Sequence, residues 1–115
     1  MAKSYLIDTS AVIKYLNGSL PESNLDFIDR IIDEEVHLSF ISKIELQVWS
    51  PPNEMDLVIY RDFVSRADIL SIDNNIISET IKIRKLYLLK LPDAIIAATA
   101  ITHNLILIAD NDKAF

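Results

Sequence analysis

The strongest constraint on the fold is an alternation of short apolar runs with longer segments of helical periodicity. The apolar runs at 4–8, 36–41, 67–72 and 105–109 have the length of buried β-strands. Strands that alternate with helices favour an α/β fold with a parallel sheet. The last run, "LILIA", is apolar on both faces, which is typical of a central parallel strand.

Helices are expected in the segments between these runs. Thr9 or Ser10 is expected to cap the first helix, and Pro92 suits the first turn of the last one. The expected helices cover 10–16, 24–35, 43–49, 54–66, 74–89 and 92–103. Three of these helices have an expected inward face. It consists of Leu25, Ile28, Ile31 and Ile32 in 24–35, of Met55, Ile59 and Phe63 in 54–66, and of Ile77, Ile81 and Leu88 in 74–89.

Length and composition limit the class of protein. A chain of 115 residues that is 50% hydrophobic has the size and the core of one domain, which we expect to span 1–115. It has no Cys, and no apolar run approaches the roughly 18 residues of a membrane span. The start, "MAKSYLIDTS", has no long apolar stretch, so a cytoplasmic protein without a membrane partner is expected. The net charge of −6 disfavours a protein that coats nucleic acid but is compatible with a nuclease.

Acidic residues follow the expected strands at the point where each strand ends. Asp8 ends the first run, and Glu45 lies in the first helical turn after the second. Asp93 opens the helix that precedes the fourth run, and Asp110 and Asp112 follow that run directly. Because sites in parallel sheets form at the carboxyl ends of the strands, these acids are expected to meet at one edge.

Each acid also has a simpler explanation on its own. Asp8 can cap a helix, and Glu45 can pair with Ser42 in a capping box. Asp93 can interact with the helix dipole, and the acids of 110–112 can be turn residues. Their coincidence at successive strand ends is what favours a shared site.

Electrostatic repulsion decides what such a site would hold. Two carboxylates about 5 Å apart repel by roughly 3 kcal/mol at an effective dielectric near 20. A cluster of them is tolerable only when protons or divalent cations neutralise it. Oxygen ligands without Cys or several His select Mg²⁺ or Mn²⁺, and carboxylate-held ions of this kind suit phosphodiester cleavage.

Four segments resemble the PIN domain family, specifically the VapC-type toxins of bacterial and archaeal toxin–antitoxin pairs. They are "YLIDTSAVIKYL", "SKIELQ", "LPDAIIAATA" and "LILIADNDKAF". The resemblance implies a three-layer α/β/α fold with a central parallel sheet of four to five strands. It also implies a Mg²⁺- or Mn²⁺-dependent endoribonuclease that a cognate VapB-type antitoxin neutralises.

The resemblance also assigns roles to individual residues. It implies that the catalytic acids are Asp8, Glu45, Asp93 and Asp112, and that the metal ligands are Asp8, Asp93 and Asp112. The family usually has Thr or Ser before the fourth acid, whereas this chain has Ala109-Asp110-Asn111-Asp112.

The sequence leaves the roles of several residues near these acids undecided. Asp110 and Asn111 are alternatives for the fourth position, and Thr9 and Ser10 are expected either to support a carboxylate or to cap the helix. The family typically continues into one more edge strand beyond the position of Phe115. The resemblance therefore implies either a domain without that strand or a missing tail.

Basic residues gather in "KIRKLYLLK", which ends just before Asp93. Lys82, Arg84, Lys85 and Lys90 are candidates for contacts to RNA phosphates, with Tyr87 as a candidate for base stacking. The alternative is a solvated helix face whose cations complement the helix dipole. His37 and His103 are expected to be structural.

The expected partners are RNA, the antitoxin and a second copy of the chain in a homodimer. The apolar helices 10–16 and 54–66, with Trp49 nearby, are candidates for the surface that binds the antitoxin or the second copy. Two other functions remain open. One is a phosphorelay receiver with Asp73 and Lys113, and the other is a PIN-like binding module without activity.

Overall fold

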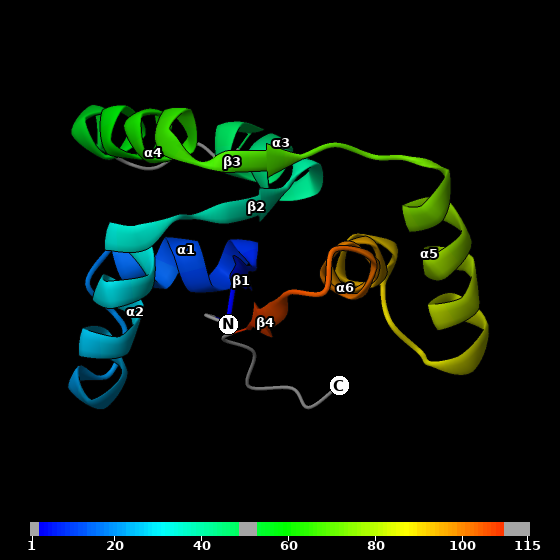
Figure 1. Cartoon of the computed structure of the whole chain (residues 1–115). Coiled ribbons are helices and arrows are strands. Elements are labelled where there is room, and N and C mark those ends of the chain that lie inside the picture. Colours follow the sequence, from blue (N-terminus) through cyan, green and yellow to red (C-terminus); the bar gives the residue numbers. More distant parts are fainter. Residues whose placement is uncertain (1–2, 49–52, 110–115) are drawn as a thin grey trace.

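A four-stranded parallel sheet forms the centre of the protein in the computed structural model, which describes residues 3–48 and 53–109. Its strands are β1 (Tyr5–Ile7), β2 (His37–Ser39), β3 (Asp68–Leu70) and β4 (Ile106–Ile108). Each strand lies inside the apolar run that predicted it. The order is β3-β2-β1-β4, and every neighbouring pair is parallel (Figure 1).

Two helices connect each strand to the next along the chain. They are α1 (Thr9–Leu16) and α2 (Glu22–Glu34), α3 (Phe40–Val48) and α4 (Glu54–Arg66), then α5 (Asn74–Leu86) and α6 (Leu91–Thr102). Because β4 pairs on the opposite side of β1 from β2, right-handed crossovers place α5 and α6 on the other face of the sheet. Figure 1 shows this separation, with α5 and α6 on the right of the sheet and α1 and α2 on its left.

Alternate residues of the strands supply the two faces of the core. Ile7 and Leu38 face the side of α1 to α4 and pack with Leu46 of α3. Leu6 faces the other side and packs with Ile96 of α6. The helix α5 is the outer member of its pair, because its buried residues pack on α6. The expected α/β/α arrangement with a parallel sheet is therefore confirmed.

The predicted inward face is right for α2 and only partly right for α4. In α2, Ile28 and Ile31 are buried as expected. In α4, Phe63 packs against the core as expected, but Met55 and Ile59 are exposed, and the buried residues are Tyr60 and Val64. Two adjacent stripes of this helix are apolar, so the 3.6-residue period fixes the spacing of the buried residues without choosing between the stripes.

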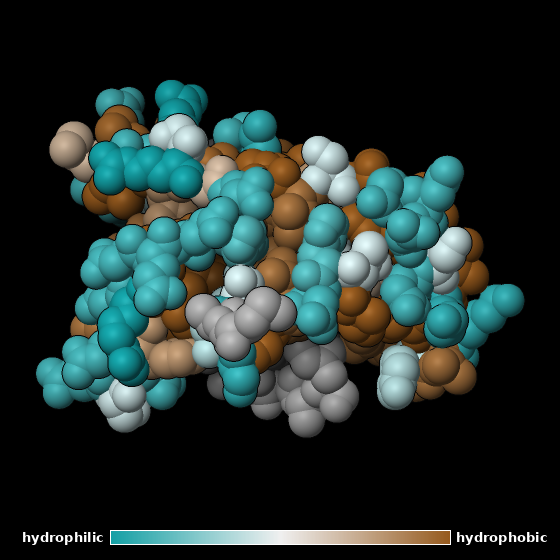
Figure 2. Space-filling view, viewed as in Figure 1, coloured by the Kyte–Doolittle hydropathy of each residue, from teal (hydrophilic) through white to brown (hydrophobic). Residues whose placement is uncertain are grey.

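The same correction applies to α5. Ile77, Ile81 and Leu88 are exposed, whereas Ile76 and Ile83 are buried against α6. Leu88 lies beyond the helix, which ends at Leu86. Figure 2 shows apolar side chains at the surface among polar ones on the side where α5 and α6 lie.

The position of β4 is a further correction. Its sequence predicts a central strand, but β4 is the last strand in the sheet order among the residues described. Ile106 is exposed there, while Ile108 packs against the core on the side of α1. None of the helices within 3–48 and 53–109 is long and apolar enough to cross a membrane.

Candidate functional site

Asp8 begins the site at the carboxyl end of β1. Its backbone N–H donates to the carbonyl of Ile108 at 2.9 Å, which fixes it between β1 and β4. Its Oδ1 accepts the backbone N–H of Ala11 at 2.7 Å. Asp8 is therefore the cap of α1, in place of the predicted Thr9 or Ser10, and its carboxylate is held at the pocket with only 8% of the residue exposed.

Glu45 enters the site from α3. This helix begins at Phe40, earlier than predicted, so Glu45 lies in the second turn and not in the first. The hydroxyl of Thr9 donates to Glu45 Oε1 at 2.6 Å, a contact between residues 36 positions apart in the sequence. Thr9 Oγ1 is also hydrogen-bonded to Ser42 Oγ at 2.9 Å. Thr9 thus connects the start of α1 to α3.

Asp93 enters from the first turn of α6, directly after Pro92. The carbonyl of Lys90 accepts the backbone N–H of Ala94 at 2.9 Å and starts the helix without a side-chain cap. An acid in the first turn interacts favourably with the helix dipole. Asp93 is half-buried and faces the pocket.

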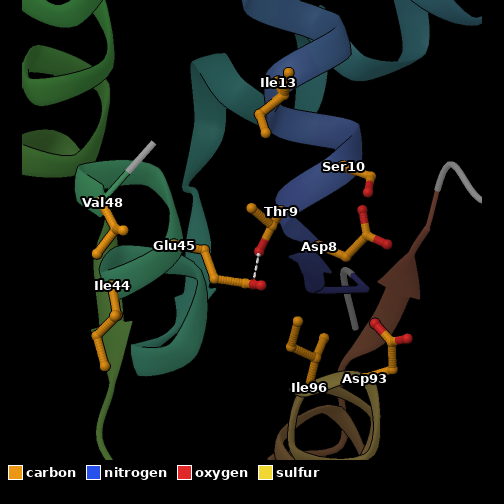
Figure 3. A pocket seen from close by; sticks show the side chains of 9 residues that line it. All are labelled: Asp8, Thr9, Ser10, Ile13, Ile44, Glu45, Val48, Asp93 and Ile96. Atoms are coloured by element: carbon orange, nitrogen blue, oxygen red, sulfur yellow. Dashed lines mark hydrogen bonds between the residues drawn. The ribbon is translucent and has the colours of Figure 1, made fainter. Parts of the chain in front are cut away.

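One pocket of about 490 Å³ brings these acids together. Figure 3 shows the carboxyl groups of Asp8 and Asp93 on one side and Glu45 reaching toward the same space from the other. Among the residues described, the lining contains no Lys, Arg or His. The lining residues are Asp8, Thr9, Ser10, Ile13, Ile44, Glu45, Val48, Asp93 and Ile96.

The apolar part of the lining forms a wall beside the acids. Ile13 of α1 and Ile44 and Val48 of α3 contribute to it. Val48 is 74% exposed, and Ile44 is also exposed. No sequence pattern predicts this wall, because Ile44 and Val48 share a short helix whose buried residues are Ser42 and Leu46.

The candidates for a fourth acid lie outside the described residues. Asp110, Asn111 and Asp112 follow Ala109, which is the last residue described. Lys113 and Trp49 also lie outside the described ranges. Asp73, the candidate phosphoacceptor of a receiver, caps α5 by accepting the backbone N–H of Ile76 at 2.8 Å, and it does not line the acidic pocket.

The predicted basic track has mixed surroundings. Lys82 Nζ lies 3.6 Å from Glu79 Oε2, and Arg84 donates to the carbonyl of Leu89. Lys85, Tyr87 and Lys90 are exposed. Lys90 is the N-cap residue of α6. It is also the basic residue of this segment that lies nearest to Asp93 in the sequence.

The two histidines lie apart from the acidic pocket. His37 Nδ1 is 2.8 Å from Asp68 Oδ2, and His37 Nε2 is 3.7 Å from Glu35 Oε2. These residues sit where β2 and β3 begin, at the opposite edge of the sheet. His103 follows α6 as its C-terminal cap. Neither histidine lines the pocket, in line with the structural role expected of both.

Ser42 is the residue of the site that the sequence did not single out. Its spacing from Glu45 predicts only a capping-box partner, but its side chain is buried and bonds to Thr9. Its spacing of three residues from Glu45 places both on one side of α3. That spacing is the available signal, and it is too common on helices to be specific.

A family model gives the first comparison with known proteins. The model described as "PIN domain" matches residues 5–115. No curated protein sequence matches the chain.

Solved structures give the second comparison. A chain of the "Toxin-antitoxin complex from Klebsiella pneumoniae" is 30% identical, with a TM-score of 0.77 and coverage of 96% of this chain and 88% of that chain. A chain of VapBC2 from Rickettsia felis, solved bound to a promoter DNA fragment, is 23% identical, with a TM-score of 0.76 and coverage of 95% and 88%. A chain of FitAcB from Neisseria gonorrhoeae is 25% identical, with a TM-score of 0.71 and coverage of 93% and 86%.

Proposed function

Because the chain belongs to the PIN domain family, we propose that it is a Mg²⁺- or Mn²⁺-dependent endoribonuclease, acting as a VapC-type toxin in the cytoplasm. Because the chain belongs to this family, we no longer propose a phosphorelay receiver as an alternative function. One observation carries the proposal. Asp8, Glu45 and Asp93 come from three separate elements and line a single pocket.

The donor chemistry of the pocket fits a divalent cation of this kind. Its polar lining consists of carboxylates and the hydroxyls of Thr9 and Ser10, with no thiol, imidazole or cationic side chain among the described residues. Oxygen-only ligand sets favour Mg²⁺ and Mn²⁺. A bound ion of this type would activate a water and stabilise the departing oxygen of a phosphodiester. We assign the ligands as Asp8, Asp93 and Asp112, with Asp110 and Asn111 as the alternatives to Asp112.

The protein residues hold and orient the reacting groups. Capping by Oδ1 is compatible with ligation by Asp8, because a carboxylate offers about four acceptor sites on its two oxygens. Glu45 faces the same space and is placed to accept a proton from the attacking water. Thr9 and Ser10 support these acids as hydroxyl donors.

Substitution of Asp8 by Asn tests the proposal most directly. Asn caps helices as well as Asp does, so Asp8→Asn removes the charge and keeps the helix cap. We expect Asp8→Asn and Asp93→Asn to lose RNA cleavage by at least about 100-fold, the size typical of losing a charged group that stabilises a transition state. Cleavage of a defined RNA in Mn²⁺ measures this loss.

Asp73→Asn is the matched control, because Asp73 caps α5 with the same geometry and lies outside the pocket. It should cleave RNA at the wild-type rate. Full activity in Asp8→Asn or Asp93→Asn, with the fold intact by circular dichroism, would reject the proposal.

Recognition of RNA is assigned to Lys82, Arg84, Lys85 and Lys90. Lys85 and Lys90 are the stronger candidates, because Lys82 is paired with Glu79 and Arg84 bonds to a carbonyl. Replacing Lys85 and Lys90 by Gln should raise the KM for RNA and flatten its dependence on salt. Unchanged KM in the double variant would argue for a solvated helix face instead.

The partners we propose are a VapB-type antitoxin and a second copy of the chain. The solved relatives named above include chains of toxin–antitoxin complexes. The exposed wall of Ile13, Ile44 and Val48 beside the acids is the surface that we assign to an antitoxin segment. The exposed stripe of α4, with Met55 and Ile59, either continues this antitoxin-binding surface or forms the homodimer interface.

A binding experiment separates these two uses of the apolar surface. Ile44→Glu should weaken antitoxin binding in isothermal titration, because it buries a charge in an apolar contact. Ile59→Glu should lower the mass seen by sedimentation when α4 forms the homodimer. The antitoxin assignment fails if Ile44→Glu binds the antitoxin as wild type does.

An inactive PIN-like binding module is the second candidate function. The departure that favours it is the doubtful fourth ligand, because Ala109-Asp110-Asn111-Asp112 has no Thr or Ser, one of which the family usually has just before its fourth acid. Isothermal titration with Mn²⁺ discriminates between the two candidates. Binding that Asp93→Asn abolishes supports the nuclease, and absence of binding supports the module.

A further inference from the structure

A hydroxyl relay connects α1 to the acid on α3 at the pocket. Thr9 Oγ1 lies 2.6 Å from Glu45 Oε1 and 2.9 Å from Ser42 Oγ. Ser42 is 0% exposed, so its hydroxyl has no access to water. Both hydrogen bonds therefore depend on how three side chains share two hydroxyl protons.

The charge of Glu45 fixes the direction of the relay. An ionised carboxylate is acceptor-only, and a hydroxyl carries a single hydrogen. Thr9 must therefore give its only proton to Glu45. The contact between Thr9 and Ser42 then requires the proton of Ser42, which donates to Thr9 Oγ1. The order of donation is Ser42 to Thr9 to Glu45, and each bond polarises the next.

The relay also fixes how the Glu45 carboxylate faces the pocket. Thr9 holds Oε1, and in the part of the chain that the structure describes no other residue bonds to this carboxylate. The carboxyl end of Glu45 reaches into the space that Asp8 and Asp93 also line (Figure 3). With Oε1 held by Thr9, Oε2 is the oxygen left for a contact in the pocket. Without the relay, the half-buried Glu45 side chain would sample several rotamers.

We propose that Ser42 and Thr9 are positioning residues for Glu45, with Ser42 directing the Thr9 proton so that Glu45 Oε2 faces the metal-binding pocket. This inference rests on the proposed nuclease function. It concerns the orientation of a carboxylate that accepts a proton and is not among the assigned ligands, so it predicts an effect on turnover and none on RNA binding or metal affinity.

Four variants test the relay. Thr9→Val removes the hydroxyl at constant shape, Thr9→Ser keeps it, Ser42→Ala removes the buried donor, and the last variant combines Thr9→Val with Ser42→Ala. Thr80→Val is the matched control, because it removes a buried hydroxyl that bonds to a carbonyl of α5, away from the pocket.

Thr9→Val and Ser42→Ala should each lower kcat about ten-fold, the lower end for residues that orient the groups of a metal site. Mn²⁺ binding should not change, because Glu45 is not among the assigned ligands. The KM for RNA should not change. Thr9→Ser and Thr80→Val should behave as wild type. The double variant should equal Thr9→Val alone, because the relay is already broken there.

A readout without metal or RNA completes the test. In the metal-free protein, the carboxyl-carbon resonance of Glu45 should move in Thr9→Val and in Ser42→Ala, and stay in place in Thr80→Val. Melting temperatures check that each variant is folded. Ser42→Ala keeps the test decisive if Thr9→Val is unstable, because it removes the other hydroxyl of the relay.

Two results would overturn the inference. One is an active wild-type protein whose Thr9→Val and Ser42→Ala variants match Thr80→Val. The other is a full additional effect of Ser42→Ala in the Thr9→Val background. An inert wild-type protein that binds no Mn²⁺ overturns the proposed function itself, and this inference with it.

Discussion

At the scale of single residues, Asp8 combines two functions that are usually separate. It caps α1 through Oδ1, and it lines the acidic pocket at the end of β1. The simple explanation of Asp8 as a helix cap and the hypothesis of a pocket acid are therefore compatible. Because Asn is an equally good cap, substitution can separate the two functions.

We expect Asp8→Ala to lower the free energy of unfolding by about 1 kcal/mol, the typical contribution of an N-cap. Asp8→Asn should unfold at nearly the same urea concentration as wild type while losing cleavage. Asp73→Ala, which removes the cap of α5, should cost a similar amount and leave cleavage intact. Equal destabilisation in Asp8→Asn and Asp8→Ala would contradict the capping argument.

Tyr15 provides a prediction about pH. Burial, followed by its hydrogen bond to Asp29 at 2.7 Å, raises the pKa of Tyr15 from 10.0 to about 12. Since the unfolded chain loses this proton near pH 10 and the folded chain near pH 12, the free energy of unfolding should fall as pH rises between these values. Ultraviolet absorbance of the phenolate measures the pKa directly.

Asp29→Asn should lower the pKa of Tyr15, because it removes the charge that opposes ionisation. Asp26→Asn on the same helix is the control, since Asp26 does not contribute to this shift. A Tyr15 that ionises at the ordinary value in the wild-type protein would show that its phenol is not held by Asp29.

At the scale of elements, α6 is defined by small side chains that let it approach its neighbours closely. Ala94 and Ala98 are fully buried against Ile76 and Ile83 of α5, and Ala100 packs against Leu6 of the sheet. Ala97 is only partly buried beside the same cluster and lines an apolar groove of about 280 Å³ near Ile101. Close packing of this helix also fixes Asp93 at its first turn.

Enlarging Ala98 should therefore be costly. Ala98→Leu should destabilise the protein by roughly 1–3 kcal/mol, the usual cost of overpacking. Ala97→Leu adds the same atoms where the groove has room, so it should cost less. Urea unfolding of both variants measures the difference, and equal costs would show that α6 does not pack tightly on α5 at Ala98.

The sequence predicted the strands well because four apolar runs separated by helical segments leave few arrangements. The acids Asp8, Glu45 and Asp93 followed from the rule that parallel strands end at one edge, and the pocket brings them together. The buried faces of α4 and α5 could not be chosen, because each helix has a second apolar stripe. The contact between Thr9 and Ser42 joins residues 33 positions apart, so no local pattern reports it.

At the scale of the whole molecule, negative charge is concentrated at the pocket among the residues that the structure describes. The chain carries a net charge of −6, and the described lining has carboxylates but no basic side chain. Cation binding should therefore stabilise the folded state more than the unfolded chain, in which these acids are far apart.

We expect Mn²⁺ at about 100 times its dissociation constant to add about 2.7 kcal/mol to the free energy of unfolding. Thermal denaturation with and without Mn²⁺ measures this as a rise in Tm. Asp93→Asn should abolish the rise. His37→Ala should retain it, because Glu35, His37 and Asp68 form a separate group of possible ligands at the other edge of the sheet. If His37→Ala lost the Mn²⁺-induced rise in Tm and Asp93→Asn kept it, the ion would bind at the group of Glu35, His37 and Asp68 and not at the acidic pocket.

Because the acids at positions 8, 45 and 93 meet only when α6 is seated on the sheet, a growing polypeptide lacks the pocket until most of its length has left the ribosome. With the proposed function, an unfinished chain would therefore be unable to cut the messenger being read or the ribosomal RNA beside the exit tunnel. The proposed RNA-cutting activity would belong to finished chains alone.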